Sequence, residues 1–441
     1  MAEVLPFRAV HYNPNMISGL NTVVTQPYDK ISPEMQARYH DLAPHNLVRI
    51  IRGRHLPNDG PHENVYLRAA RHFREWMEER IMVSEAEPAL YPYYQEYSLP
   101  GRAATLERRG FIALLRLQDY AARVVHRHEE TLSGPKRDRL ELLKATRAHF
   151  GQIFMLYGDP EGSIETALEA HCRDPLWQHV EDEYGTLHSV WKVTDPFTIE
   201  QVAEAMIDRQ LVIADGHHRY ETALAYRDLC RTESASDERS EYVMATFVRM
   251  ESPGLTILPT HRVVHGLSRF DWQQFVSGAL SLFDWEDVPS QLADWRRFVE
   301  DLVAAGLEGP ALGAYAQPAR LALLRLRKNA DLARLLPDLP SGLRSLDVVI
   351  LHRLLLEGVL GISRQAVLEE SNLRYVRELE AAIAEVDQSK AQICFLLNPT
   401  PIAVVRENAL AGIPMPQKST DFYPKLLSGL TIYWLDNPAG I

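Results

Sequence analysis

The stretch at residues 211–227, LVIADGHHRYETALAYR, decides the fold of the chain around it. Its first four residues are apolar, Asp215 and Gly216 follow, and apolar residues from Tyr220 to Tyr226 then recur at helical spacing. This order predicts a buried strand, a tight turn and a helix. Gly216 suits the turn because glycine accepts a positive φ and allows a ligand to approach the backbone closely.

The predicted turn has the features of an anion-binding site. His217, His218 and Arg219 fall in the first helical turn, where backbone N–H groups lack intrahelical partners and the helix dipole is positive. Arginine can add a bidentate contact to a phosphate. We therefore expect Gly216, His217, His218 and Arg219 to bind phosphate. The alternative is an ordinary strand–helix corner whose polar side chains are only solvated.

Composition narrows the class of protein. The chain has 441 residues, more than a single core usually supports, so we expect more than one domain. A net charge of −12 disfavours a nucleic-acid binder, which normally presents a basic face. Three cysteines without a CxxC pair fit a reducing compartment and argue against a thiolate zinc site. With no signal peptide and no apolar run of about 18 residues, we expect a cytoplasmic protein without a membrane partner.

We expect a mixed α/β fold with two domains, at residues 1–267 and 268–441. In the first domain, the patterns predict an amphipathic helix at 63–80 and strands at 5–9, 23–25, 45–53, 90–97, 110–117, 153–157 and 243–250. In the second domain, they predict helices at 271–283, 346–360 and 401–411 and strands at 312–316, 320–327, 391–398 and 430–435. Because the helix at 346–360 is strongly apolar, we interpret its His352 as a core residue rather than a ligand.

The segment at residues 126–143, HRHEETLSGPKRDRLELL, is a second concentration of reactive groups. It places acidic and basic side chains in a loop, interrupted by Gly-Pro, that leads into a predicted helix. A loop between ordered elements is a common place for a site. Its charged residues are alternatively no more than a solvated surface.

The segment GIPMPQKS at residues 412–419 has the outer spacing of a P-loop but carries Gln417 where the second glycine belongs. It also carries two prolines, so the nest of backbone N–H groups that holds phosphates cannot form there. We reject a Walker fold. Side chains of this region remain candidates for phosphate contacts, against a purely structural loop: Lys418, Ser419, Thr420 and Lys425.

The sequence favours a carboxylate site for Mg²⁺ over a histidine site for zinc. His217 and His218 are adjacent and point in different directions, so they make a poor chelating pair for zinc. Mg²⁺ prefers one or two carboxylates together with nucleotide phosphates. We therefore expect Asp215 or Asp29 to hold Mg²⁺.

Seven motifs occur in a fixed order along the chain. They are PYDKIS (27–32), HNLVRI (45–50), RHEET with KRDRLELL (127–143), IADGHHRYETAL (213–224), LPTHR (258–262), LLNPTP (396–401) and MPQKSTDFYPKLLSGL (415–430). Together they resemble the family of bacterial and archaeal proteins called domain of unknown function 1015. The resemblance extends over the whole chain and implies no settled activity.

The Asp-Gly-His-His-Arg turn at residues 215–219 is similar to the phosphate-binding turn of the ParB/sulfiredoxin superfamily. That superfamily includes nucleotide-binding partition proteins, sulfiredoxin, and free-serine kinases with the same turn. The resemblance implies a ParB/sulfiredoxin-like N-terminal core with insertions, and we expect a second α/β domain after it. The density of polar residues at 415–425 favours a loop at 412–428 that closes over the site. His217 stands where sulfiredoxin has its reactive cysteine, so the kinase branch remains.

The resemblance and the residues together predict a phosphotransferase that uses Mg²⁺ and ATP or ADP and acts on a small metabolite hydroxyl, with serine as one candidate. Glu129 is the expected base on that hydroxyl, and His128 and Asp215 complete the catalytic set. The remaining expectations are phosphate contacts by Lys136, Arg139, Lys418 and Ser419, and substrate contacts by Tyr28, Asp29, Thr131, His261 and Arg262. The alternatives are a non-catalytic nucleotide or metabolite sensor, and a ParB-like nucleotide hydrolase or DNA-associated protein. A homo-oligomer stays open.

Overall fold

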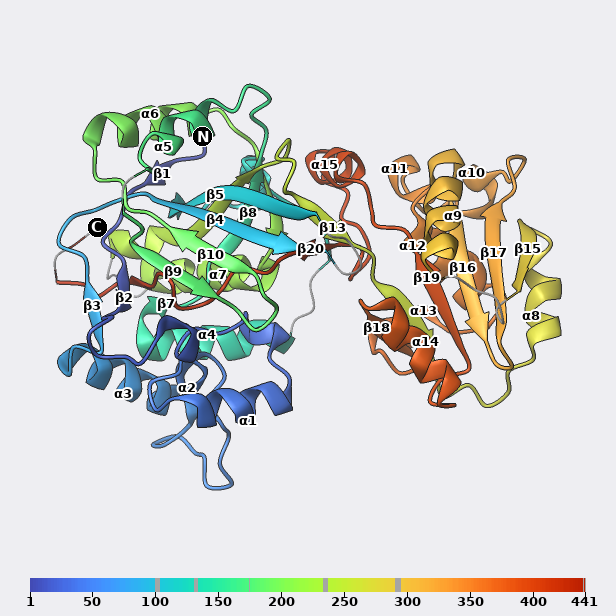
Figure 1. The fold of residues 1–441 in the computed structure, drawn as a ribbon, viewed down its shortest axis with the longest axis horizontal. Coiled ribbons are helices and arrows are strands. Elements are labelled where there is room, and N and C mark those ends of the chain that lie inside the picture. The colour runs from blue at the N-terminus through green and yellow to red at the C-terminus, as the bar shows by residue number, and fades with distance from the viewer. Residues whose placement is uncertain are drawn as a thin grey trace. The chain divides into compact units, whose positions relative to one another are not determined.

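The computed structural model describes residues 1–99, 104–130, 134–173, 175–232, 237–289, 295–438 and 440, which form two compact units (Figure 1). Unit 1 contains Met1–Arg127, Thr131–Thr256 and Pro424–Ile441, and unit 2 contains His128–Glu130 and Ile257–Tyr423. The division differs from the predicted boundary at residue 267. His128–Glu130 belong to unit 2, whose main segment begins at Ile257. The chain returns to unit 1 at Pro424.

Unit 1 is mixed α/β, as expected. Its strands are β1 (Val4–Leu5), β2 (Val10–Tyr12), β3 (Met82–Ser84), β4 (Tyr91–Ser98), β5 (Thr105–Arg116), β6 (Val125–Arg127), β7 (Ala148–His149), β8 (Ile153–Tyr157), β9 (Gln178–Glu181), β10 (Leu187–Val190), β11 (Leu211–Asp215), β12 (Tyr242–Arg249) and β21 (Tyr433–Trp434). Its α-helices are α1 (Pro33–Leu42), α2 (Val48–Ile51), α3 (Val65–Glu78), α4 (Gly134–Thr146), α5 (Ser163–Glu169), α6 (Pro196–Met206) and α7 (His217–Thr232). Its short 3₁₀ turns are η1 (Leu20–Thr22), η2 (Tyr28–Lys30), η3 (Tyr120–Ala122) and η4 (Glu238–Glu241).

The main sheet of unit 1 is mixed. Among the described residues it has nine strands in the order β6-β11-β8-β12-β5-β4-β10-β9, with β1 beside β5. β11 pairs in parallel with β6 and antiparallel with β8, and β12 pairs in parallel with β8. β11 is therefore an interior strand, which explains why residues 211–214 form a continuous apolar run rather than an alternating one.

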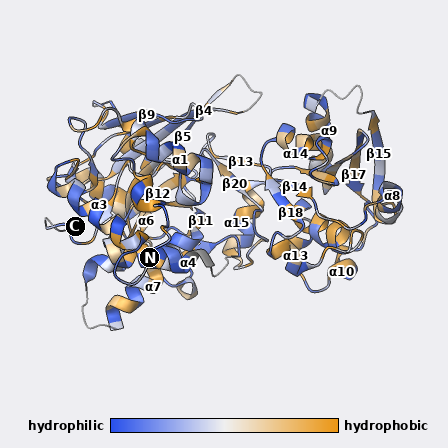
Figure 2. Ribbon diagram, turned by 90° about the horizontal axis from the view of Figure 1, so that it is seen from below, coloured by the Kyte–Doolittle hydropathy of each residue, from blue (hydrophilic) through white to orange (hydrophobic). Residues whose placement is uncertain are grey.

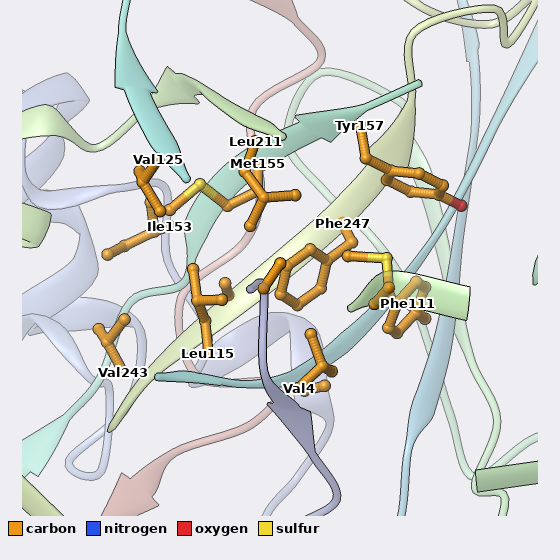
Figure 3. Close-up of a cluster of buried hydrophobic side chains, with 14 of the residues drawn as sticks. Val4, Phe111, Leu115, Val125, Ile153, Met155, Tyr157, Leu211, Val243 and Phe247 are labelled. Atoms are coloured by element: carbon orange, nitrogen blue, oxygen red, sulfur yellow. The ribbon is translucent and has the colours of Figure 1, made fainter. Parts of the chain in front are cut away.

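One face of this sheet carries a hydrophobic core. Alternate residues of each strand point to the same side, and Figure 3 shows these side chains meeting in one cluster. They include Phe111 and Leu115 of β5, Ile153, Met155 and Tyr157 of β8, Leu211 of β11, and Val243 and Phe247 of β12. Buried side chains of α5, α6 and α7 complete the cluster: Ile164, Leu168, Val202, Met206, Tyr220 and Ala223.

The returning segment from Pro424 onward (dark red in Figure 1) crosses the opposite face of the sheet, where a few polar side chains lie among buried apolar ones. Arg108 of β5 donates to the carbonyl of Pro424, and Gln95 of β4 donates to the carbonyl of Lys425 over 2.9 Å. Farther along, Gln152 lies 3.4 Å from the hydroxyl of Thr431. These contacts fix the backbone of the segment against the sheet.

Helices α1–α4 build a second core in unit 1 with β2, β3 and Phe150. α3 alternates between hydrophobic and hydrophilic residues (Figure 2), and Asn64 caps its N-terminus, so the predicted helix at 63–80 is confirmed. The strand predicted at 45–53 is wrong, because Val48–Ile51 form the short helix α2. The strand predicted at 23–25 is also replaced, by η1 and an isolated bridge between Thr25 and Ser428.

Unit 2 is a separate α/β layer structure. Its strands are β13 (Thr256–Leu258, whose first residue is counted in unit 1), β14 (His261–Val264), β15 (Phe283–Pro289), β16 (Ala311–Ala316), β17 (Arg320–Leu326), β18 (Leu373–Val376), β19 (Ile393–Leu397) and β20 (Asp421–Tyr423). Its helices are α8 (Trp272–Ala279), α9 (Trp295–Glu308), α10 (Leu332–Leu335), α11 (Ser341–Arg344), α12 (Asp347–Ile350), a π-helix η6 (Leu351–Glu357), α13 (Arg364–Leu368), α14 (Leu379–Asp387) and α15 (Ile402–Leu410).

In the described residues of unit 2, six strands pair in the order β15-β17-β16-β19-β14-β18. Helices α9 and α14 pack on this sheet through Phe298, Leu302 and Ile383. The predicted strands at 312–316, 320–327 and 391–398 correspond to β16, β17 and β19. Within the part of the chain that the structure describes, no helix has the length and apolar character that crossing a bilayer requires.

Candidate functional site

The turn between β11 and α7 is the centre of the candidate site. β11 ends at Asp215, Gly216 has a φ of 93°, and α7 begins at His217. The register of β11 against β8 shifts between Ile213 and Asp215, which marks a β-bulge. Bulges re-aim side chains at the ends of strands, and here the bulge precedes the carboxylate. The strand, turn and helix predicted for residues 211–227 are confirmed.

Arg219 folds back over this turn. Its Nη2 donates to Oδ2 of Asp215 over 2.6 Å, and its Nη1 donates to the carbonyl of Gln152. A Cβ at Gly216 would lie 3.0 Å from Nε of Arg219, and one at Gly151 would lie 3.3 Å from Nη1. The two glycines therefore leave the room that the guanidinium occupies.

A second cation approaches the same carboxylate. Nζ of Lys425 lies 3.8 Å from Oδ1 of Asp215, and the Lys425 side chain is only 8% exposed. Burial alone would raise the pKa of Asp215, but the charges of Lys425, Arg219 and Lys30 outweigh it and hold that pKa well below its usual range. Asp215 is therefore ionised at neutral pH, and its single negative charge is shared by two cations in direct contact.

Tyr28 and Arg139 lie beside the turn. The Arg139 guanidinium stacks over the Tyr28 ring at 4.2 Å and donates to the carbonyl of Ile51 and to Asp138. Burial and the neighbouring charge of Asp29 raise the pKa of Tyr28 to about 12. A cavity of about 70 Å³ is lined by Tyr28, Arg139, Gly151, Arg219, Thr222 and Ser428.

Two other predicted residues of unit 1 have different surroundings. Lys136 forms an ion pair with Glu221 of α7, which ties α4 to α7. Asp29 lies in η2 with an exposed side chain. The structure thus brings Tyr28 and Arg139 to the wall of the cavity that Arg219 also lines, and it gives Lys136 a carboxylate partner within the helical layer.

His128 and Glu129 form a cluster in unit 2 with Thr420. Oε1 of Glu129 accepts from the backbone N–H of Thr420 over 3.2 Å and lies 3.2 Å from the Thr420 hydroxyl. The same hydroxyl lies 2.7 Å from Nε2 of His128. Two backbone hydrogen bonds also link the segments: the amide of Met415 donates to the carbonyl of His128, and the amide of Glu130 donates to the carbonyl of Met415. Glu129 is thus oriented by both backbone and side chain.

The other predicted residues of unit 2 support this cluster. Arg262 is buried in β14 and donates through Nη2 to the carbonyl of Lys418 over 2.8 Å. Burial lowers the pKa of the Arg262 guanidinium to about 10. The Ser419 hydroxyl donates to the carbonyl of Pro416 over 2.5 Å, and the Lys418 side chain is exposed. Nδ1 of His261 accepts from the amide of Leu397, and burial together with Arg262 lowers the pKa of His261 to about 4.

Thr131, predicted as a substrate contact, lies outside the described residues. The donor set around Asp215 does not fit a metal well, because Arg219 and Lys425 already contact both carboxylate oxygens. Among the described residues, no group of three or more His, Cys, Asp or Glu side chains is arranged to hold a metal ion. Asp215 is better described as the partner of two cations than as a ready metal ligand.

Some residues of the turn's surroundings escape sequence reasoning. Gln152 and Gly151 hold and accommodate Arg219, yet nothing in their own sequence neighbourhood signals this. The sequence suggests that Lys425 and Lys418 belong to one loop, whereas the structure places Lys425 in unit 1 and Lys418 in unit 2. The signal that could have separated them is Pro424, whose restricted backbone favours a change of direction.

The chain was compared with solved structures. It is similar to a conserved hypothetical protein from Pyrococcus furiosus (10% identity, TM-score 0.35, covering 71% of this chain and 93% of that chain). It is similar to a free serine kinase in complex with AMP (11% identity, TM-score 0.35, covering 70% and 89%). It is also similar to SbnI with C-terminal truncation from Staphylococcus aureus (9% identity, TM-score 0.34, covering 74% and 89%).

No curated protein matches the sequence. The family described as "Protein of unknown function (DUF1015)" matches residues 4–349, which is more than half of the chain. The motifs at 396–401 and 415–430 lie outside the matched range, and those between residues 27 and 262 lie within it. The chain belongs to the family described as protein of unknown function DUF1015.

Proposed function

We propose that unit 1 binds the phosphate groups of a nucleotide at the N-terminus of α7, and that the protein transfers the terminal phosphoryl group to the hydroxyl of a small metabolite. One observation carries the proposal. Arg219 and the buried Lys425 converge on a single carboxylate, Asp215, two residues before the first residue of a 16-residue helix. Two cations therefore lie beside the turn at which an anion would bind.

Two cations beside the N-terminus of a helix favour binding of an anion. A buried ammonium is costly unless a counter-charge or hydrogen bonds compensate it. A phosphate at the turn would supply negative charge to Lys425 and Arg219 and accept from the backbone N–H groups of the first turn of α7. The absence of a Cβ at Gly216 leaves the room beside the turn that the Arg219 guanidinium occupies.

The group-transfer step is a displacement at phosphorus. The oxygen of the acceptor hydroxyl forms a bond to the terminal phosphorus of ATP or ADP, and the bond from that phosphorus to its bridging oxygen breaks. ADP or AMP leaves with the bridging oxygen, and the acceptor proton passes to Glu129. Such a step asks the protein mainly for positioning and for neutralising the charge on the phosphoryl oxygens.

Glu129 is suited to accept the proton because Thr420 orients its Oε1 through two contacts. It is the second residue after β6, and β6 is the parallel neighbour of β11. We assign no step to Mg²⁺, since both oxygens of Asp215 already contact cations. Arg262 is assigned to holding the 415–420 loop, and His261 to its contact with Leu397 of β19.

The proposal is tested by nucleotide binding to purified full-length protein. Calorimetric titration with ATP and ADP should give a Kd for the wild type that weakens at least about tenfold in Arg219→Ala. Arg231→Ala is the matched control, because Arg231 lies at the other end of α7 and pairs with Glu241. Equal affinity of the wild type and Arg219→Ala would overturn the site assignment.

A second measurement separates a kinase from a sensor. Turnover of ATP and ADP is followed with a panel of small hydroxyl compounds that includes serine. Glu129→Gln should retain the wild-type Kd and lose turnover, because the amide cannot accept the proton. If nucleotide binds but neither protein turns it over with any acceptor, the protein is a nucleotide sensor and the catalytic part of the proposal fails.

A further inference from the structure

Three polar side chains lie in one row across the main sheet of unit 1, on the face that the segment after Pro424 crosses. Arg108 of β5 is the register partner of Gln95 of β4, and Gln95 is the register partner of His188 of β10. Register partners on neighbouring strands point to the same face of a sheet. All three residues are buried, with exposed fractions of 2% or less. Burying polar groups is costly unless hydrogen bonds compensate it, so the row needs partners.

The backbone at Lys425 supplies part of these hydrogen bonds. Arg108 donates to the carbonyl of Pro424 and to Oε1 of Gln95. Nε2 of Gln95 donates to the carbonyl of Lys425 over 2.9 Å. Because these carbonyls belong to consecutive residues, the two contacts fix the main chain from which the Lys425 side chain extends. The Nζ atom of that side chain lies 3.8 Å from Oδ1 of Asp215.

A chain of hydrogen bonds reaches the same segment from the turn at residues 182–186. Oδ2 of Asp182 lies 3.3 Å from Nε2 of His188, and Nδ1 of His188 lies 2.6 Å from the hydroxyl of Tyr93. The amide of Leu427 donates to that hydroxyl over 3.4 Å. The Asp182 side chain is 3% exposed and accepts from two backbone amides of its own turn. The far end of the chain is therefore anchored.

The protonation states give this chain one direction. Burial acts to raise the pKa of Asp182, but hydrogen bonds from His188 and from backbone amides keep that pKa below its usual value. Burial lowers the pKa of His188, so its imidazole is neutral at neutral pH. An ionised carboxylate only accepts, so Nε2 of His188 donates to it and Nδ1 accepts from Tyr93. The Tyr93 oxygen is then oriented to accept from Leu427.

We propose that Tyr93, Gln95 and His188 are positioning residues for Lys425, which keep its ammonium beside Asp215, where a phosphate would bind. This inference rests on the proposed function, because it concerns the same anion site. Tyr93 and Gln95 fix backbone groups at and beside Lys425, and His188 orients Tyr93. An ammonium that is already held in place loses less conformational entropy when an anion binds, so its order raises the affinity.

Tyr93→Phe tests this role with a small change, since it keeps the ring and removes the hydroxyl that contacts His188. The Kd for ATP, measured by calorimetric titration of the full-length protein, should rise by about fivefold. Tyr91→Phe is the matched control. The Tyr91 hydroxyl is also buried on β4, but it bridges the carbonyl of Phe7 and the amide of Ala9. An unchanged Kd in Tyr93→Phe, or an equal rise in Tyr91→Phe, would overturn the proposal.

Gln95 and His188 are tested in the same way. Gln95→Met removes the donor to the Lys425 carbonyl and should also raise the Kd by about fivefold. His188→Leu should do the same. His188→Asn should keep the wild-type Kd, because its amide oxygen can accept from Tyr93 in place of Nδ1. A wild-type Kd in Gln95→Met or in His188→Leu would remove that residue from the positioning set.

A double-mutant cycle with Lys425→Met separates positioning from a general loss of structure. If Tyr93 acts through Lys425, Tyr93→Phe should raise the Kd in the wild-type background and leave it unchanged in Lys425→Met. A rise of the same size in both backgrounds would show a merely structural role and overturn the proposal.

Urea denaturation of the same four proteins gives a second cycle that needs no nucleotide. Tyr93→Phe should cost less stability in the Lys425→Met protein than in the wild type, because the Lys425–Asp215 contact that it disturbs is already absent there. Additive losses would overturn the positioning role whether or not nucleotide binds. Non-additive losses in a protein that binds no nucleotide would support the positioning role and overturn the proposed function instead.

Discussion

Nη2 of Arg219 and Oδ2 of Asp215 lie 2.6 Å apart, on either side of the Gly216 turn. The pair joins the last residue of β11 to the first turn of α7, so strand, turn and helix are held together by one charge-assisted hydrogen bond. Because Lys425 contacts the other oxygen of Asp215, the carboxylate positions two cations at once. A phosphate that binds at the turn would meet both cations already oriented.

Gly216→Ala should disturb this arrangement directly. At a φ of 93° an alanine is strained, and its Cβ would lie 3.0 to 3.1 Å from three atoms of the Arg219 guanidinium group. We expect a loss of about 1 to 2 kcal/mol in the free energy of unfolding and weaker nucleotide binding. Urea denaturation and calorimetric titration measure the two effects. Gly60→Ala is the control, since nothing lies within 4 Å of a Cβ there, and an equal effect in both variants would contradict the prediction.

Lys425→Met should separate charge from packing. Methionine keeps much of the buried side-chain volume but removes the ammonium that faces Asp215. We expect the Kd for ATP or ADP to rise at least about tenfold, as loss of a charged hydrogen bond to phosphate implies. The exposed Lys144, which pairs with Glu141, provides the control variant Lys144→Met. An unchanged Kd in Lys425→Met would remove Lys425 from the phosphate site.

Thr420→Val tests the orientation of Glu129. Valine retains the shape of threonine but removes the hydroxyl that lies 3.2 Å from Glu129 and 2.7 Å from His128. If Glu129 is the base, kcat should fall by about tenfold while the nucleotide Kd stays constant. Ser281→Ala, an exposed hydroxyl of unit 2 that donates to the carbonyl of Gly278, should leave both constants unchanged. A change in Kd alone would assign Thr420 to binding instead.

Asp347 should give unit 2 a pH-dependent stability. Burial raises the pKa of its carboxyl to about 7, although Ala311 and Asn398 donate to it. In the unfolded chain the pKa is about 3.9, so between these values the folded state holds a proton that the unfolded state has lost. This group therefore stabilises the fold least at high pH, and its contribution declines as pH rises from about 4 to about 7.

Asp347→Asn removes that titration. Urea midpoints recorded by circular dichroism from pH 4 to pH 8 should decline more steeply with rising pH in the wild type than in the variant. The variant should be the more stable protein, relative to the wild type, at the upper end of the range. Parallel curves for the two proteins would show that Asp347 is ionised in the folded state.

The sequence was most informative where one physical requirement dominated. An interior strand must be apolar on both faces, and a turn with a positive φ favours glycine, so residues 211–227 identified β11, Gly216 and α7. At the start of α1, Ser32 is an N-cap residue followed by Pro33, and its side chain accepts from the amide of Met35. At these places local preference and tertiary environment agree, which is why local reasoning succeeded.

At other places the tertiary environment determined the local structure. Residues 45–53 have strand-forming side chains, yet Asn46 donates to the carbonyl of Thr22 and accepts from the amide of Val48. These contacts start a helical turn whose Val48, Ile50 and Ile51 are all buried, and burial outweighs the intrinsic preference. The contact of Lys425 with Asp215 is long-range in sequence. It depends on how residues from Pro424 onward cross the face of the sheet opposite to the cluster in Figure 3, which no local pattern encodes.

The crossing of the sheet by residues after Pro424 has a consequence for synthesis of the protein. β21 pairs with β7, Ser428 bridges Thr25, and Ile432 bridges Val10. The unit that is translated first therefore lacks its final strand and Lys425 until the ribosome has passed all of unit 2. Domains usually fold in the order of their synthesis, but here the second unit can finish before the first. A nascent chain that ends before residue 425 cannot form the Asp215–Lys425 pair. Anion binding that depends on this pair would therefore show that translation has passed residue 425.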